Sequence, residues 1–295
     1  MTAPRSASTL APAKINLFLR VLHRRPDGYR ELETLFQAVS LYDRVRVHLE
    51  PVGTSSIRLE VVGADLGPSR DNLAWRAAQS FLSSFGMSAR VEIELEKHIP
   101  AGAGLGGGSS DAAAVLRCMA ALTGVSDGNA LHRVGTRLGS DVPFFLGAPL
   151  ALGRGRGEEL TEVSALPRRP VVLALPPVHQ PTVEAFRMLP EEDVHGGARV
   201  VPLREDLAWD QVDEWSENDF ESAVVDIHTE VQDSLEALVG AGADVAGLSG
   251  SGSACFGCFD SDEVASAVAT TLSARLGWRF VAVSTESSLP TITES

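Results

Sequence analysis

The sequence feature that most constrains the fold is a glycine-rich segment in the first half of the chain. Five of the seven residues 102–108 are glycine, two serines follow, and residues 111–122 have the pattern of a helix that ends at Gly124. The first N–H groups of a helix are unpaired, the helix dipole is positive there, and glycine lets an anion approach the backbone. The segment therefore predicts a phosphate-binding loop, with Ser109 and Ser110 as hydroxyl donors or as ligands of a phosphate-bound Mg²⁺.

Three common phosphate loops do not fit this segment. Gly102, Gly104 and Gly107 have the spacing of a dinucleotide fingerprint, but that motif needs a strand that ends in an acidic residue about twenty positions on. Asp127 stands at that distance in a turn. A Walker A loop needs a lysine, which is absent here, and the His-Arg-Asp and Asp-Phe-Gly motifs of protein kinases are missing from the sequence.

Strands and helices mix along the chain without strict β-α-β alternation, which predicts an α+β fold. Strands are expected at residues 11–22, 45–49, 57–61, 91–95, 171–175 and 280–284, and helices at 73–85, 111–122, 131–138, 221–238 and 262–276. We expect Asp71 to cap the first helix, residues 190–217 to be irregular, and the last residues to be frayed. A change of composition at residues 164–170 places a boundary near residue 160 and divides the chain into lobes 1–160 and 161–295.

The amino-acid composition excludes some classes of function. The net charge is −14, from 39 acidic and 25 basic residues. This argues against nucleic-acid binding, which needs a basic face, but leaves room for a nucleotide substrate. No apolar run is long enough for a membrane span or a signal peptide. Three cysteines cannot all pair internally, so we expect a reduced, cytoplasmic protein, with Cys255 and Cys258 packed on a strand rather than binding metal.

The basic residues are almost all arginine, and the sequence contains only Lys14 and Lys97 as lysines. Lysine carries a compact point charge, whereas arginine presents a wide planar fork. Each lysine is therefore expected at a position where the guanidinium of an arginine would not fit. The alternatives are a surface lysine for Lys14, which lies in an apolar segment, and a charge at the end of a strand for Lys97.

The segment from Pro100 to Ser110 resembles the phosphate-binding motif of the GHMP kinases. Residues 11–17 resemble the N-terminal motif of that family, and residues 248–254 resemble its C-terminal glycine motif. The resemblance implies a two-lobed α+β kinase that uses ATP and Mg²⁺. Its N-terminal lobe would be like ribosomal protein S5 domain 2, and its C-terminal lobe would have a ferredoxin-like core.

Within the family, residues 12–16, 25–29 and 139–145 resemble one branch more closely. That resemblance implies transfer of the ATP γ-phosphoryl group to the 2-hydroxyl of a cytidine diphosphate-linked methylerythritol, in the non-mevalonate route to isoprenoids. Two alternatives remain. Another GHMP kinase, such as a homoserine or mevalonate kinase, is disfavoured by residues 26–29 and 139–143. A nucleotide-binding protein without catalysis is disfavoured by the presence of Lys14 and Asp141.

The resemblance also implies roles for residues. Asp141 would accept the hydroxyl proton, although an aspartate can also cap a turn. Lys14 would keep Asp141 ionised, and Asn16 would position the methylerythritol unit. Lys97 would lie near ATP, with Mg²⁺ held mainly by the ATP phosphates rather than by protein ligands. The expected ATP loop consists of Pro100, Ala101, Gly102, Ala103, Gly104, Leu105, Gly106, Gly107, Gly108, Ser109 and Ser110.

Recognition of the acceptor is expected from both lobes. Tyr29 and Phe186 would clamp the cytosine ring, with core packing as the alternative for Phe186. Arg30 stands where the family pattern has histidine, and it would donate to the base or the diphosphate or else point to solvent. The backbone of Gly250, Ser251 and Gly252 would close the acceptor pocket. The implied partners are small molecules, and the sequence leaves monomer and homodimer open.

Overall fold

The first sheet is built on a long hairpin. The computed structural model describes residues 5–190 and 207–295 of the chain. β1 (Arg5–Arg24) and β2 (Arg30–Pro51) pair antiparallel, and in the described residues they form the centre of a seven-stranded sheet in the order β11-β1-β2-β4-β3. β5 pairs with β2, and β6 with β5. The other strands are β3 (Ser56–Val62), β4 (Ala89–Glu96), β5 (Leu150–Arg154), β6 (Glu159–Glu162) and β11 (Thr293–Glu294).

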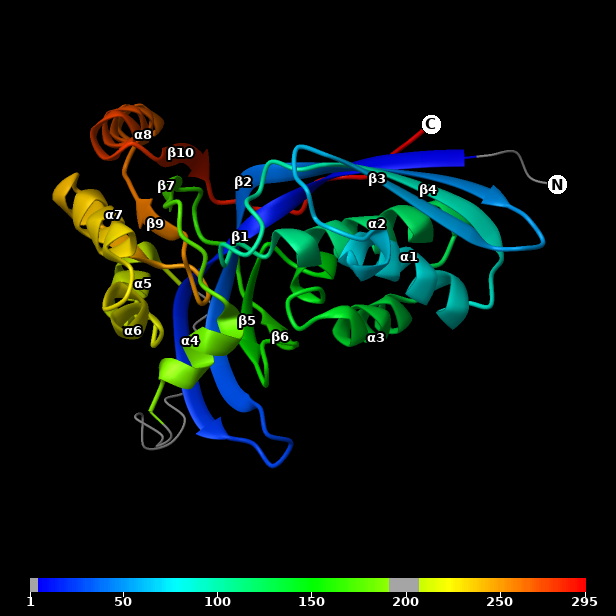
Figure 1. Cartoon of the computed structure of the whole chain (residues 1–295), viewed down its shortest axis with the longest axis horizontal. Helices are drawn as coiled ribbons and strands as arrows, with labels where there is room; N and C mark the ends of the chain where they lie inside the picture. Colours follow the sequence, from blue (N-terminus) through cyan, green and yellow to red (C-terminus); the bar gives the residue numbers. More distant parts are fainter. Residues whose placement is uncertain (1–4, 191–206) are drawn as a thin grey trace.

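Helices cover one face of this sheet (Figure 1). They are α1 (Leu73–Ser84), α2 (Gly107–Thr123) and α3 (Gly128–Leu138). α2 is rich in alanine, which has the highest helix propensity, and it stops at Gly124 in the left-handed conformation with φ 73°. The helix starts four residues earlier than the predicted Asp111. The last glycines of the loop therefore form its first turn, which aims their N–H groups along the helix axis.

The second sheet has the order β10-β7-β9-β8, with each pair antiparallel. Apart from the short helices that the described residues place between β7 and α7, its elements run in the order β7, α7, β8, β9, α8 and β10, which is the β-α-β-β-α-β order of a ferredoxin-like unit. The predicted C-terminal core is confirmed. The bounds are β7 (Pro170–Leu175), α7 (Thr229–Gly240), β8 (Val245–Leu248), β9 (Cys255–Cys258), α8 (Asp262–Leu276) and β10 (Arg279–Ser284).

β1 connects the two halves. Ile15 and Leu17 share a buried core with Leu173 and Phe256 of the second sheet, while Ala7 and Ala11 of the same strand pack in the core under α2. The segment that carries Lys14 and Asn16 therefore lies where both cores meet. The proposed boundary near residue 160 stays a prediction, because β11 returns from the end of the chain to pair with β1. That pairing contradicts the expected frayed end.

Local differences from the sequence prediction have physical reasons. The helix expected at residues 221–238 is two helices, α6 (Glu221–Val225) and α7, because the β-branched residues of 224–229 weaken helix propensity at the junction. Asn72 rather than Asp71 caps α1, since its Oδ1 accepts from the N–H of Ala74 at 2.9 Å. The remaining elements are α4 (Thr182–Met188), α5 (Trp209–Trp215) and the short turns η1 (Ser69–Asp71) and η2 (Phe144–Leu146).

The cysteines match their predicted structural role. Cys255 and Cys258 are free and buried on β9, and burial raises the pKa of both thiols. In residues 5–190 and 207–295, no cluster of His, Cys, Asp or Glu is arranged to hold a metal ion. Within the same ranges, no helix has the length and apolar character that crossing a membrane requires.

Candidate active site

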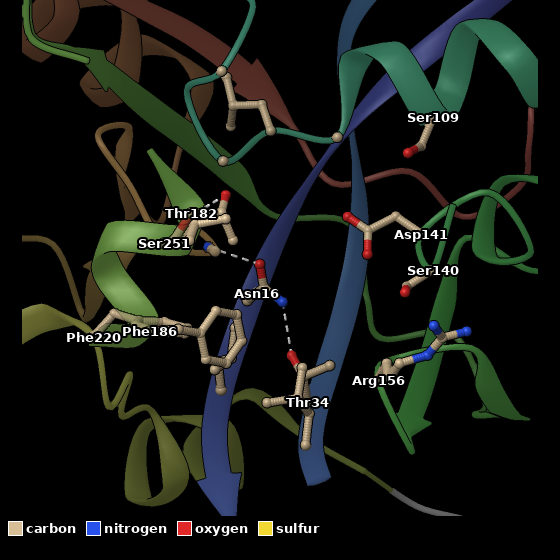
Figure 2. A pocket seen from close by; sticks show the side chains of 18 of the residues that line it. Asn16, Thr34, Ser109, Ser140, Asp141, Arg156, Thr182, Phe186, Phe220 and Ser251 are labelled. Atoms are coloured by element: carbon tan, nitrogen blue, oxygen red, sulfur yellow. Dashed lines mark hydrogen bonds between the residues drawn. The ribbon is translucent and has the colours of Figure 1, made fainter. Parts of the chain in front are cut away.

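A cavity of about 1100 Å³ opens between the β1–β2 hairpin, the glycine loop, α4 and the turn that follows β8. Figure 2 shows this cavity with Asn16 and Thr34 on the hairpin, Asp141 on the opposite wall, and Phe186 at one side. Most residues predicted from the sequence line it. They are Lys14, Asn16, Tyr29, Arg30, Pro100, Ala101, Gly102, Ala103, Gly104, Leu105, Gly106, Gly107, Gly108, Ser109, Asp141, Phe186, Gly250 and Ser251.

Lys14 and Asn16 form a buried network at the centre of the cavity. Lys14 Nζ donates to Asn16 Oδ1 at 2.6 Å, and the same oxygen accepts from the Gly250 N–H at 2.8 Å. Asn16 Nδ2 donates to Thr34 Oγ1 at 2.7 Å, and that hydroxyl donates onward to the Phe18 carbonyl at 2.6 Å. The amide therefore has a single orientation, because its oxygen faces two donors and its nitrogen faces an acceptor.

The electrostatics of Lys14 depend on burial and on Asp141. Burial lowers the pKa of Lys14 because it penalises the charged ammonium, and the charge of Asp141 opposes this shift. Lys14 Nζ also lies 5.7 Å from the centre of the Phe36 ring. Figure 2 shows the Asp141 carboxylate pointing into the cavity. The two groups therefore line one cavity and interact by charge.

The glycine loop packs against both lobes. Gly102, Gly104 and Gly106 have φ values of 70°, 79° and 70°, a region that side chains rarely adopt. A Cβ on Gly104 would lie 2.0 Å from the Ser249 carbonyl oxygen, and one on Gly106 would lie 3.0 Å from Lys14 Cγ. These glycines are required for close packing as well as for an exposed backbone. The loop consequently has a fixed position relative to Lys14.

The two serines of the loop point in different directions. Ser109 lines the cavity, and Figure 2 shows its hydroxyl directed toward the space in front of Asp141. Ser110 is buried, and its Oγ has no hydrogen-bond partner. The helical period explains this difference, because neighbouring residues on α2 lie about 100° apart around the axis. The structure therefore does not bring the Ser110 hydroxyl into the cavity.

Lys97 also lies away from the cavity. Its ammonium is buried and donates to Asp43 and to Asp111, the second at 2.7 Å. Asp43 Oδ1 accepts from the backbone N–H groups of His98 and Ile99 at 2.6 and 2.9 Å. Burial raises the pKa of Asp111 to about 7, Lys97 opposes the shift, and Asp43 adds to it. The Lys97 side chain thereby ties the start of the loop to the first turns of α2, and its expected contact with ATP stays a prediction.

Aromatic and cationic side chains gather at the other end of the cavity. Tyr29 is 56% exposed on the hairpin turn, and the Arg156 guanidinium lies 4.9 Å from its ring centre. Phe186 of α4 packs edge-on against Phe220 with 4.9 Å between ring centres. Arg30 donates to the backbone carbonyls of Leu22 and Pro190. Its guanidinium thus connects the hairpin to the end of α4 at the rim of the cavity.

Some lining residues were not predicted. Arg156 lies in the turn between β5 and β6, where the alternation of arginine and glycine at residues 153–157 was its only signal. Thr182 Oγ1 and Ser251 Oγ are 2.9 Å apart and join α4 to the turn after β8. Gly252 was predicted but does not line the cavity, because it packs toward Leu248, whose Cδ1 would lie 3.1 Å from an added Cβ.

Comparison with known proteins agrees with this geometry. The GHMP kinases N terminal domain matches residues 72–148, and the GHMP kinases C terminal domain matches residues 202–277. The chain is 40% identical over 277 residues to 4-diphosphocytidyl-2-C-methyl-D-erythritol kinase of Syntrophotalea carbinolica, covering 94% of this chain and 98% of that protein. It is 41% identical over 269 residues to the protein of the same name in Solibacter usitatus, covering 88% and 83%.

The chain belongs to the 4-diphosphocytidyl-2-C-methyl-D-erythritol kinase family of the GHMP kinases. A crystal structure titled 4-(cytidine 5'-diphospho)-2C-methyl-D-erythritol kinase has 38% sequence identity and a TM-score of 0.78, covering 94% of this chain and 98% of that one. A homoserine kinase from Cytophaga hutchinsonii has a TM-score of 0.71 at 17% identity and covers 98% and 97%. The second match shows only that the fold is shared. The two-lobed α+β fold predicted for GHMP kinases is thereby confirmed.

Proposed function

We propose that the chain transfers the γ-phosphoryl group of ATP to the 2-hydroxyl of 4-diphosphocytidyl-2-C-methyl-D-erythritol, a step in isoprenoid biosynthesis. The observation that carries the proposal is one cavity with two chemically different ends. Lys14, Asn16 and Asp141 surround the end beside the glycine loop, while Tyr29 and Phe186 line the other. Such a cavity suits an acceptor with a polyol at one end and a flat ring at the other.

The glycine loop would hold the ATP phosphates. The N–H groups at the start of α2 face the cavity, and glycine allows oxygen atoms to approach them. This arrangement fits a Mg²⁺ ion that is coordinated mainly by the ATP phosphates. Ser109 and Asp141 offer the hard oxygen ligands that Mg²⁺ prefers, yet the described residues contain no ready-made metal cluster. When bound, Mg²⁺ would neutralise charge on the phosphates.

Asp141 and Lys14 would act on the acceptor hydroxyl. Its oxygen attacks the γ-phosphorus, the bond from that phosphorus to the oxygen it shares with the β-phosphate breaks, and ADP leaves. The hydroxyl proton passes to Asp141, whose carboxylate faces the cavity. The charge of Asp141 raises the pKa of Lys14 against the effect of burial, so it favours a charged ammonium beside the acceptor hydroxyl.

The charge of the cavity supports two anionic substrates. Although the whole chain has a net charge of −14, the described lining contains one carboxylate, that of Asp141. Its cationic side chains are Lys14, Arg24, Arg30, Arg156 and Arg187. This local positive field would attract both the ATP phosphates and the acceptor diphosphate. Tyr29 and Phe186 would stack on the cytosine. Stacking of an aromatic side chain on a base contributes roughly 1–3 kcal/mol to binding.

One assay tests the proposal. Purified protein is mixed with ATP, Mg²⁺ and one acceptor at a time, and ADP release is measured for 4-diphosphocytidyl-2-C-methyl-D-erythritol, its uridine analogue, mevalonate and homoserine. We expect the highest kcat/KM with the cytidine compound. Preference for mevalonate or homoserine would assign the chain to another GHMP activity. ATP binding without turnover on any of the four acceptors would indicate a nucleotide-binding protein that has lost catalysis.

A further inference from the structure

A short segment outside the cavity, Glu217–Asp219, runs beside the strand that carries the central network. The Leu19 N–H donates to the Glu217 carbonyl at 2.8 Å, and the Asp219 N–H donates to the Leu19 carbonyl at 3.0 Å. These bonds make a parallel bridge between Leu19 and Asn218. The Val21 N–H donates to Asp219 Oδ2 at 2.6 Å, which fixes the segment further. The position of Asn218 is thus set by β1 itself.

The Asn218 side chain reaches from this segment to the turn after β8. Its Nδ2 donates to the carbonyl oxygens of Leu248 and Gly250, each at 2.8 Å. Its Oδ1 accepts from the Phe220 N–H at 3.0 Å. Both N–H groups of the amide are therefore used to hold two carbonyls of one turn. Without the amide, these two carbonyls would lose their donors.

The turn held by Asn218 is the one that holds Asn16. Gly250 has φ 57°, and its N–H donates to Asn16 Oδ1 at 2.8 Å, beside the bond from Lys14 Nζ to the same oxygen. A Cβ on Gly250 would lie 3.2 Å from Lys14 Nζ. Glycine has many accessible backbone conformations, so an external contact is needed to keep its N–H in one direction. On one side of Gly250 the Ser249 carbonyl accepts from the Gly252 N–H at 3.0 Å, and on the other side Asn218 holds the Gly250 carbonyl.

We propose that Asn218 is a positioning residue for Lys14. By fixing the turn at Gly250, it fixes the orientation of the Asn16 amide and thereby the direction of the Lys14 ammonium. The inference rests on the proposed function, since the positioned ammonium acts on the acceptor hydroxyl. The loss of Asn218 leaves both Lys14 and Asn16 in place but lets the turn, and with it the ammonium, take several positions.

The two lysines of the sequence make a direct test feasible. Labelling the lysine ε-carbons with ¹³C yields one signal from Lys14 and one from Lys97, and a Lys97→Arg variant assigns them. In Asn218→Ala, we expect the Lys14 signal to shift or broaden while the Lys97 signal stays, because Lys97 is held by Asp43 and Asp111. A general loosening of the fold would change both signals.

Steady-state kinetics accompany the spectra. Asn218→Ala should lower kcat by about 10-fold or more and raise KM for the acceptor, with KM for ATP within about twofold of wild type. Glu217→Gln is the matched control, because it keeps the backbone bonds of the segment and removes only the charge that pairs with Arg20. It should leave kcat and both lysine signals unchanged. Asn218→Ser, which retains one hydroxyl donor, should give intermediate effects and serves if the alanine variant does not fold.

The outcomes separate the two hypotheses. Unchanged lysine signals in Asn218→Ala and Asn218→Ser, or equal changes in both signals, would overturn the positioning role. So would a loss of kcat in Glu217→Gln as large as in Asn218→Ala. A wild-type chain that lacks turnover while its Lys14 signal still responds to Asn218→Ala would contradict the proposed function and leave the coupling between Asn218 and Lys14 established.

Discussion

The triad beneath the glycine loop makes stability depend on pH in a way that one substitution should remove. Lys97 lies between Asp43 and Asp111, so one positive charge faces two buried carboxyl groups. Burial raises the pKa of Asp111 from 3.8 to about 7. The folded protein therefore keeps a proton on Asp111 over a pH range in which the unfolded chain has released it. Asp111→Asn replaces this carboxyl with a neutral group of the same shape.

The magnitude follows from linkage. Because the folded pKa of Asp111 is raised, its contribution favours folding most below about pH 4 and is lost as the pH rises toward 7. Between pH 5 and pH 8, a shift of this size lowers the free energy of unfolding by roughly 2–3 kcal/mol. The Asp111→Asn variant has no carboxyl group at this position, so its free energy of unfolding does not fall for this reason. Relative to wild type, Asp111→Asn should thus become more stable by about that amount between pH 5 and pH 8.

Urea denaturation at the two pH values measures the effect. The quantity of interest is the difference in unfolding free energy between wild type and Asp111→Asn, since the titration of all other groups cancels in it. Asp233→Asn, at an exposed position on α7, is the matched control and should show no such change. If the difference between wild type and Asp111→Asn is the same at pH 5 and pH 8, Asp111 does not hold a proton in the fold and the reasoning is refuted.

Three further predictions address the loop, the acceptor and the proposed base. Gly104→Ala should destabilise the protein by more than about 2 kcal/mol and abolish ATP binding, since its Cβ would lie 2.0 Å from the Ser249 carbonyl oxygen. Its control is Gly86→Ala, a position with a positive φ but no atom within 4 Å of the added Cβ. In chemical denaturation, Gly86→Ala should lower the free energy of unfolding by only about 1–2 kcal/mol. Arg30→Ala should raise KM for the acceptor more than KM for ATP, whereas Arg30→His should change it modestly; two unchanged constants would exclude Arg30 from base recognition. Asp141→Asn should retain ATP affinity by calorimetry and lose on the order of 10²-fold in kcat, and a variant with near wild-type turnover would show that Asp141 is not the base.

Several residues that line the cavity were predicted from the sequence because they stand in short, continuous motifs. The glycine content of the loop predicts phosphate binding, and Lys14 and Asn16 are two residues apart on one strand. The role of Lys97 was not predictable in this way, because its partners Asp43 and Asp111 are 54 and 14 residues away and meet only through pairing and packing. Because the sequence contains only two lysines, the position of Lys97 was expected to require a lysine, but this did not indicate a structural function.

Residues that act through the backbone were the hardest to find. Asn218 lies between the segment 190–217, which was expected to be irregular, and the helix expected from residue 221, and its importance comes from two carbonyls in another part of the chain. Arg156 stood in a recognised turn, yet nothing in its sequence indicated that the turn would lie beside Tyr29. The split between α6 and α7 shows the same limit for elements, since a weak junction of β-branched residues was read as part of one continuous helix.

The most direct test of the central claim identifies the product. Wild-type protein is incubated with ATP, Mg²⁺ and 4-diphosphocytidyl-2-C-methyl-D-erythritol, and the product is analysed by ³¹P and ¹³C NMR. The account predicts a new phosphomonoester signal, with phosphorus coupling on the carbon that carries the 2-hydroxyl and the diphosphate signals retained. A phosphoryl group on another hydroxyl, or ADP formed without any phosphorylated acceptor, would contradict it.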